Sequence, residues 1–95
     1  MEKAAFLAHV KGMVQGVGFR YFTYREASSL GITGYVKNLS NGQVEVFAEG
    51  SRENLQALLD RLQQGPGAGY VEKVDVQWKS FEDKYHRFSV ESSYY

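Results

Sequence analysis

The sequence contains no cysteine among its 95 residues. Without thiols the chain needs no oxidising compartment, and it can offer neither a cysteine nucleophile nor a thiolate metal site. It also has no excess charge of either sign, because 11 Lys and Arg balance 11 Asp and Glu. A neutral chain has no overall field that would attract a polyanion such as DNA, so any site for an anion must be local.

Long apolar runs are missing as well. No segment approaches the roughly 20 apolar residues that span a membrane, and the N-terminal residues lack the apolar run of a signal peptide. We therefore expect a soluble cytoplasmic protein with no membrane partner. The chain is long enough to form one domain, residues 1–95, that folds without disulfides or metals.

Alternation of apolar and polar residues predicts strands, and apolar residues at helical spacing predict helices. The predicted strands span 4–11, 32–39, 43–49 and 70–78, and the predicted helices span 19–30 and the segment that follows Ser51. Phe88 and Val90 indicate a short last strand near an edge of the sheet. Gly12 is expected to end the first strand, and Asn41-Gly42 predicts a type I′ turn that pairs the second and third strands antiparallel.

This order is β-α-β-β-α-β with a short extra C-terminal strand. Two helices that each bury one apolar stripe can share one face of a single antiparallel sheet. The predicted fold class is therefore α+β, with the ferredoxin-like arrangement of two helices on one face of an antiparallel sheet.

A glycine-rich turn from Gln15 to Arg20 lies between the first predicted strand and the first predicted helix. Backbone N–H groups at the start of a helix have no intrahelical partner and can bind an anion. Gly16 and Gly18 permit backbone angles closed to other residues, and the guanidinium of Arg20 can bind two oxygens of a phosphate. The turn thus indicates a phosphate-binding loop, with an ordinary strand-to-helix turn and a surface arginine as the alternative.

Two common phosphate motifs do not match this turn. It lacks the Gly-Lys-Ser/Thr ending of a nucleoside-triphosphate loop, and Tyr21 stands where a dinucleotide fingerprint needs its third glycine. The aromatic residues that follow could form a surface for stacking bases, but their helical spacing favours the core for some of them. They are Phe19, Tyr21, Phe22 and Tyr24.

Asn38 has low strand propensity and lies near the end of the second predicted strand. It could form local hydrogen bonds before the turn. Alternatively, its carboxamide could hold a water molecule in a fixed orientation, since it both donates and accepts. The predicted topology allows Asn38 to lie near the phosphate-binding loop, although spacing alone does not require it.

Three segments together are similar to the acylphosphatase family, and the similarity extends over almost the whole chain. They read KGMVQGVGFR (11–20), GYVKN (34–38) and NGQVE (41–45). The resemblance implies a ferredoxin-like fold and hydrolysis of the carboxyl–phosphate bond of small acyl phosphates, without a metal or other cofactor. The products would be a carboxylate and inorganic phosphate, which would also act as an inhibitor.

The resemblance also assigns roles to particular residues. It implies that Arg20 binds the substrate phosphate and that Asn38 orients the attacking water as the second catalytic residue. The implied phosphate cradle comprises Gln15, Gly16, Val17, Gly18, Phe19 and Arg20. We expect no metal site, because His86 has no partner at ligand spacing and His9 is typical of a half-exposed strand residue.

Two alternatives belong to other functional classes. Residues 16–22 superficially resemble the aromatic RNP1 signature of an RNA-binding domain with the same order of elements. That signature belongs on a third strand, however, whereas this run precedes a helix, and the chain has no basic surface charge in excess. The other alternative is a non-catalytic module that binds a protein partner. We expect an enzyme that acts as a monomer on a small molecule and binds no nucleic acid.

Overall fold

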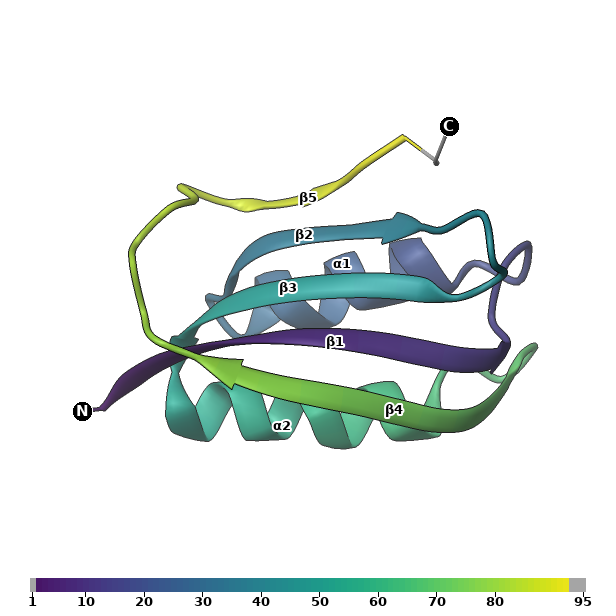
Figure 1. The fold of residues 1–95 in the computed structure, drawn as a ribbon, viewed down its shortest axis with the longest axis horizontal. Coiled ribbons are helices and arrows are strands. Elements are labelled where there is room, and N and C mark those ends of the chain that lie inside the picture. The colour runs from purple at the N-terminus through teal and green to yellow at the C-terminus, as the bar shows by residue number, and fades with distance from the viewer. Residues whose placement is uncertain (1, 93–95) are drawn as a thin grey trace.

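The computed structural model describes residues 2–92 and forms one sheet with two helices (Figure 1). The elements, in chain order, are β1 (Lys3–Met13), α1 (Phe19–Ser29), β2 (Thr33–Asn38), β3 (Val44–Ser51), α2 (Arg52–Gln64), β4 (Tyr70–Lys79) and β5 (Phe88–Val90). All strands and helices predicted from the sequence are present, with boundaries shifted by a few residues at most.

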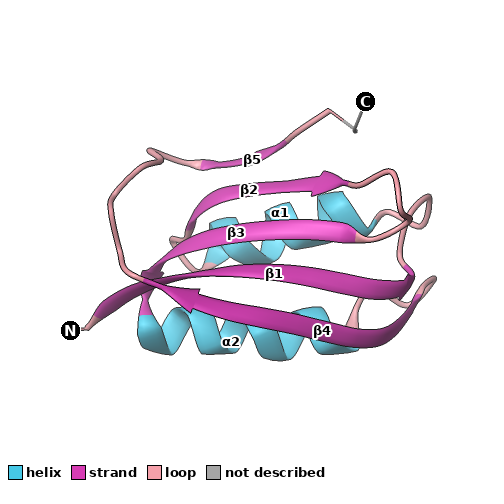
Figure 2. Cartoon of the chain, in the orientation of Figure 1, coloured by secondary structure: helices cyan, strands magenta, loops and turns pink. Residues whose placement is uncertain are grey.

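The strands lie in the order β4-β1-β3-β2-β5. Both helices pack against the same face of the sheet, α2 behind β1 and β4 and α1 behind β2 (Figures 1 and 2). This arrangement confirms the ferredoxin-like α+β prediction. The first four strands pair antiparallel, whereas β5 pairs parallel with β2, so the sheet is mixed. Within residues 2–92, neither helix has the length and apolar character needed to cross a bilayer.

The core lies between the sheet and the two helices. Alternate residues of the central strands, such as Phe6 on β1 and Val46 on β3, are fully buried on the helix side. Opposite them, α2 buries an apolar stripe at the i, i+3, i+4 and i+7 spacing of a helix face. The stripe comprises Leu55, Leu58, Leu59 and Leu62. The helix begins where predicted, since Ser51 Oγ accepts a hydrogen bond from the N–H of Asn54 at 3.1 Å.

Gly12 does not end β1, contrary to prediction. The strand continues to Met13 through an irregular register between Lys11 and Gly12, where it remains paired with β4. Gly12 has φ 133°, and a Cβ at this position would collide with the backbone of Tyr70. Glycine at this position is typical of a bulge that bends a strand, and the bend leads the chain into the glycine-rich loop of residues 15–20.

The β2–β3 connection is a hairpin, as predicted, but its turn is not type I′. That turn would need positive φ at both Asn41 and Gly42. Only Gly42 has it, at 91°. The N–H of Gly42 donates to Leu39 O at 3.2 Å and the N–H of Leu39 donates to Gln43 O at 2.9 Å, so three residues form the loop. This is the common three-residue hairpin, a turn followed by a glycine in the left-handed region.

The chain from β4 to β5 is held by a buried carboxylate. Glu49 on β3 is 1% exposed, and its two oxygens accept hydrogen bonds from the N–H groups of Glu82 at 2.8 Å and Lys84 at 2.9 Å. Both bonds are charge-assisted and satisfy the carboxylate without a cation. The segment between β4 and β5 is therefore fixed over the open face of the sheet, and β5 lies at the sheet edge beside β2.

Candidate active site

A hollow of about 310 Å³ opens where β1 leads into α1 and β2 ends. These segments meet at one end of the molecule, on the right in Figure 1. The hollow also reaches β5, the edge strand of the sheet. It is lined by Val14, Gly16, Gly18, Phe19, Arg20, Tyr21, Asn38 and Val90. Residues from four segments of the chain thus form one concave site.

The loop leaves its backbone open toward the hollow. Gly16 and Gly18 have φ of 78° and 81°, and a Cβ on either would meet nothing within 4 Å. Left-handed backbone angles rather than lack of space require glycine at both positions. Gly18 is the N-cap of α1 and supplies no side-chain cap, and the first turn carries no acidic residue. The first amides of α1 therefore have neither a capping oxygen nor a nearby carboxylate, and the helix dipole favours an anion there.

The side chain of Gln15 points away from this opening. Its Nε2 donates to Leu39 O at 2.7 Å and to Gln43 O at 2.8 Å. Leu39 and Gln43 are the two residues that flank the β2–β3 turn. A single amide group therefore joins the phosphate-binding loop to the hairpin. This contact fixes the loop relative to Asn38, the residue that immediately precedes Leu39.

Arg20 lies in the first turn of α1 and is held from the other end of the chain. Its Nη1 donates to the carbonyl oxygen of Glu91 at 2.8 Å, across 71 residues. Glu91 in turn donates its N–H to Val36 O at 2.9 Å, which continues the pairing of β5 with β2. A guanidinium has five N–H donors, so this contact orients Arg20 and leaves donors for an anion in the hollow.

Asn38 ends β2 and lines the same hollow. Its Oδ1 is buried and has no hydrogen-bond partner within residues 2–92. Buried polar atoms are nearly always paired, so an unpaired one needs an explanation. A partner in the hollow would reach Oδ1 only after the carboxamide rotates, because the atom has almost no accessible surface as it stands.

The sequence-predicted site residues fall into two groups. Gly16, Gly18, Phe19, Arg20 and Asn38 line the hollow, whereas Gln15 and Val17 do not. Val17 packs against the core instead. Sequence reasoning missed the contributions of Tyr21, Val90 and the Glu91 carbonyl. Tyr21 was visible as an aromatic residue beside Arg20, whereas the last strand was predicted from Phe88 and Val90 without any local pattern that placed it at the site.

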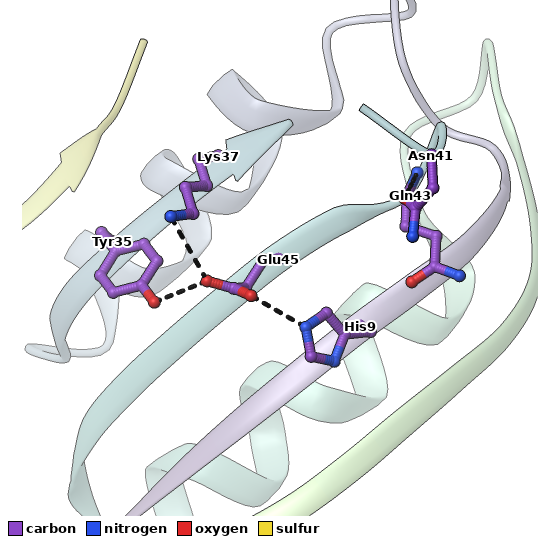
Figure 3. A network of polar contacts seen from close by, with 6 residues as sticks. All are labelled: His9, Tyr35, Lys37, Asn41, Gln43 and Glu45. Carbon is purple, nitrogen blue, oxygen red and sulfur yellow. Dashed lines mark hydrogen bonds and ion pairs between the residues drawn. The ribbon is translucent and has the colours of Figure 1, made fainter. Parts of the chain in front are cut away.

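A second polar cluster lies on the open face of the sheet, away from the helices (Figure 3). Glu45 accepts hydrogen bonds from His9 at 2.9 Å and Tyr35 at 2.7 Å, with Lys37 Nζ 3.7 Å away. Burial disfavours charge on Glu45, but its two hydrogen bonds and the nearby Lys37 outweigh burial and lower its pKa. Burial and the bond to Glu45 raise the pKa of Tyr35. The predicted role of His9 as a partly exposed strand residue is confirmed.

The aromatic run near the loop does not form a stacking surface on the sheet. Phe19 is 1% exposed and Phe22 packs against the core, whereas Tyr21 and Tyr24 are exposed on α1. Part of the run is core, as predicted. An RNP1 signature would instead present its aromatics from a strand, so the position of these side chains argues against the RNA-binding alternative.

No three side chains of His, Cys, Asp or Glu within residues 2–92 are grouped so that they could hold a metal ion. The donors gathered in the hollow are backbone amides, a guanidinium and a carboxamide. These groups suit a phosphate-like anion better than a cation. The fold and this hollow together define a ferredoxin-like domain that gathers groups suited to an anion at one end of its sheet.

Comparisons with known proteins assign the family. The family model described as Acylphosphatase matches residues 6–90. An acylphosphatase from Thermus thermophilus is 53% identical over 72 residues, covering 76% of this chain and 82% of the relative. Another, from Caldanaerobacter subterraneus, is 41% identical over 90 residues and covers 95% of this chain and 99% of the relative.

The solved structures agree with the sequence relatives. The crystal structure of acylphosphatase from Bacillus subtilis superposes with a TM-score of 0.90 at 36% identity, covering 93% of this chain and 98% of that one. An acylphosphatase from Coxiella burnetii gives 0.88 at 38% identity, with coverage of 94% and 93%. The chain belongs to the acylphosphatase family. It is a hydrolase of acyl phosphates, which it converts to a carboxylate and inorganic phosphate.

Proposed function

We propose that Arg20 and the backbone amides of residues 15–20 hold the phosphoryl group of the substrate, while the Asn38 carboxamide orients the attacking water. One observation carries this proposal. Asn38 lines the same hollow as Arg20, and its Oδ1 has no hydrogen-bond partner among the described residues. Donors suited to phosphate oxygens and the carboxamide group therefore belong to one hollow.

The reaction follows from this arrangement. The water oxygen forms a bond to phosphorus, and the bond from phosphorus to the bridging carboxyl oxygen breaks, with its electron pair leaving on the carboxylate. Both protons of the water end on the phosphate product, one of them through a phosphate oxygen of the substrate itself. The transition state spreads charge over the equatorial oxygens, where amides and a guanidinium stabilise it most.

The leaving group explains why the site needs no acid residue. A carboxylic acid has a pKa near 4, so the departing carboxylate is a weak base that needs no proton. Asn38 is also too weak a base to remove a proton, and its contribution is position alone. We propose that the reaction needs no metal. Full activity in EDTA with benzoyl phosphate is the expected result, and loss of activity that Mg²⁺ restores would contradict it.

Variants of Arg20 test the phosphate site. Arg20→Ala should lower kcat/KM for benzoyl phosphate by about 10³ or more, as loss of an arginine contact does in other phosphoryl transfers. Arg20→Lys should also fail, because an ammonium lacks the planar fork. Arg87→Ala, at an exposed position outside the hollow, is the matched control and should change kcat/KM little. Retained activity in Arg20→Ala would remove Arg20 from the mechanism.

Variants of Asn38 test the water site separately. Asn38→Ala should lower kcat by about 10²-fold, the cost of misplacing a reactant, while inorganic phosphate still inhibits at its former concentration. Asn41→Ala, at the exposed turn, is the control. A variant of Asn38 that keeps kcat but loses phosphate affinity would contradict the water-orienting role.

We also propose that the protein acts as a monomer in the cytoplasm and binds no nucleic acid. Its balanced charge supports the last point, because non-specific binding to nucleic acid depends on excess basic residues. Sedimentation of the purified chain, fractionation of cells and an RNA gel shift at low salt test the three statements. A stable dimer, a membrane-bound fraction or a salt-sensitive shift would each contradict one of them.

A further inference from the structure

We propose that the rim of the hollow selects acyl phosphates whose acyl group has a flat apolar part, and that Tyr21 and Val90 determine this specificity. The inference rests on the proposed function, in which the phosphoryl group occupies the loop end of the hollow. The acyl group must then extend from the phosphoryl group toward the remaining lining residues.

Tyr21 and Val90 are joined to the phosphate end by one contact. Tyr21 follows Arg20 and Val90 precedes Glu91, and the Arg20 side chain donates to the Glu91 carbonyl at 2.8 Å. The two apolar side chains therefore lie at a fixed position relative to the guanidinium that would hold the phosphate. Both line the hollow, and both are exposed, at 59% and 43%.

The hollow is larger than a phosphate group. At about 30 Å³ for each oxygen-sized group, four phosphate oxygens occupy at most about 120 Å³. The hollow measures about 310 Å³, within the range of small-molecule sites. The hollow therefore has room for more than a phosphate group, and Tyr21 and Val90 belong to its lining.

The ring of Tyr21 is held in place although it is exposed. It stacks on Tyr24 with ring centroids 6.1 Å apart and an interplanar angle of 27°. The guanidinium of Arg25 lies 5.5 Å from its centroid. An aromatic ring held by its neighbours loses little freedom when a ligand packs against it. The exposed residues Met13 and Tyr70 lie opposite each other on β1 and β4 and do not line the hollow.

Steady-state hydrolysis of acetyl and benzoyl phosphate tests the inference. For Tyr21→Ala we expect the ratio of kcat/KM for benzoyl over acetyl phosphate to fall by about three- to tenfold, the scale of one aromatic pair. The fall should lie in KM for benzoyl phosphate with kcat kept, since a contact far from phosphorus is equal in ground and transition states. Tyr21→Phe keeps the ring and should restore the ratio. Val90→Ala should lower it less.

The controls separate this inference from the proposed function. Tyr70→Ala removes an equally exposed tyrosine outside the hollow and should leave the ratio unchanged. If the unaltered chain hydrolyses neither substrate, the proposed function fails and this inference with it. If it hydrolyses both and Tyr21→Ala and Val90→Ala leave the ratio unchanged, the inference alone is overturned. An equal fall in kcat for both substrates in Tyr21→Ala would also overturn it, because Tyr21 would then act only by positioning Arg20.

Discussion

Replacement of Gln15 by leucine should loosen the active site without removing any group proposed to touch the substrate. The side chain keeps its approximate volume but loses Nε2, which donates to Leu39 O at 2.7 Å and Gln43 O at 2.8 Å. These two bonds join the phosphate-binding loop to the hairpin that carries Asn38. Their loss should therefore affect both stability and the orientation of the attacking water.

The size of the effect follows from the two bonds. Each contributes about 0.5–1.5 kcal/mol, so Gln15→Leu should lower the free energy of unfolding by about 1–3 kcal/mol. For a domain of this size, each kcal/mol corresponds to a fall in Tm of about 4–8 °C. A shift of the hairpin by 1 Å could cost up to about 10²-fold in kcat, because the reacting atoms would no longer be aligned.

Urea unfolding and hydrolysis of benzoyl phosphate measure the two effects. Gln15→Glu gives a second test, because its carboxylate would face two carbonyl oxygens at neutral pH. It should destabilise more than leucine at pH 7 and recover in acid, when a protonated Glu can again donate. Gln63→Leu, at an exposed position on α2, is the control. If Gln15→Leu keeps both its unfolding free energy and its kcat, the contact does not fix the loop and the reasoning is wrong.

Three further predictions concern the scaffold. The folded-state pKa of Glu45 is lowered, so its stabilising effect is present above its unfolded pKa and is lost as pH falls through the folded value. Glu45→Gln should therefore lower the free energy of unfolding by about 1–3 kcal/mol at pH 7. A loss of the same size at pH 3, measured by urea unfolding, would refute this prediction. Glu49→Gln replaces one acceptor oxygen by an N–H donor that faces a backbone N–H. It should lower the free energy of unfolding by about 1–3 kcal/mol and speed proteolysis within residues 80–87. Protease resistance equal to that of the unaltered chain would contradict the role of the buried carboxylate in holding this segment. In Gly34→Ala the new Cβ would collide with the Phe47 carbonyl at a φ of 141°, so the variant should not fold, as judged by circular dichroism. Gly42 has a φ of 91° and open space around it, so Gly42→Ala should lower the free energy of unfolding by only about 1–2 kcal/mol. A well-folded Gly34→Ala would show that the strands can separate without loss of stability.

The resemblance to the acylphosphatases depends on short local segments of sequence. The correct predictions of strands and helices also depended on local patterns. The strand and helix positions follow from alternation and from the leucine stripe of α2, which depend only on neighbouring residues. The glycine-rich loop could be singled out as a candidate phosphate site because Gly16, Gly18 and Arg20 lie within five residues. Where the local pattern allowed more than one answer, the prediction failed, as at Gly12 and at the Asn41-Gly42 turn.

The Asn41-Gly42 turn illustrates the reason. Both a two-residue and a three-residue loop accept this dipeptide, because each needs a glycine with positive φ. Pairing of Leu39 with Gln43 decides between them, and the Gln15 side chain binds the carbonyls of the same two residues. Within the turn the Gln43 N–H also donates to Asn41 Oδ1 at 3.0 Å, and the Gln15 contact adds a bond from another part of the chain that no local pattern encodes.

The sequence by itself determined the elements, the fold class and the presence of an arginine and an asparagine suited to phosphate chemistry. Only the tertiary structure decided that Arg20 and Asn38 line one hollow, that Glu91 orients the arginine across 71 residues, and that Tyr21 and Val90 form the rim. The division has a physical cause. Backbone preferences and apolar periodicity act between residues a few positions apart, whereas the site depends on how a bulge in β1, a hairpin and a parallel edge strand bring distant segments together.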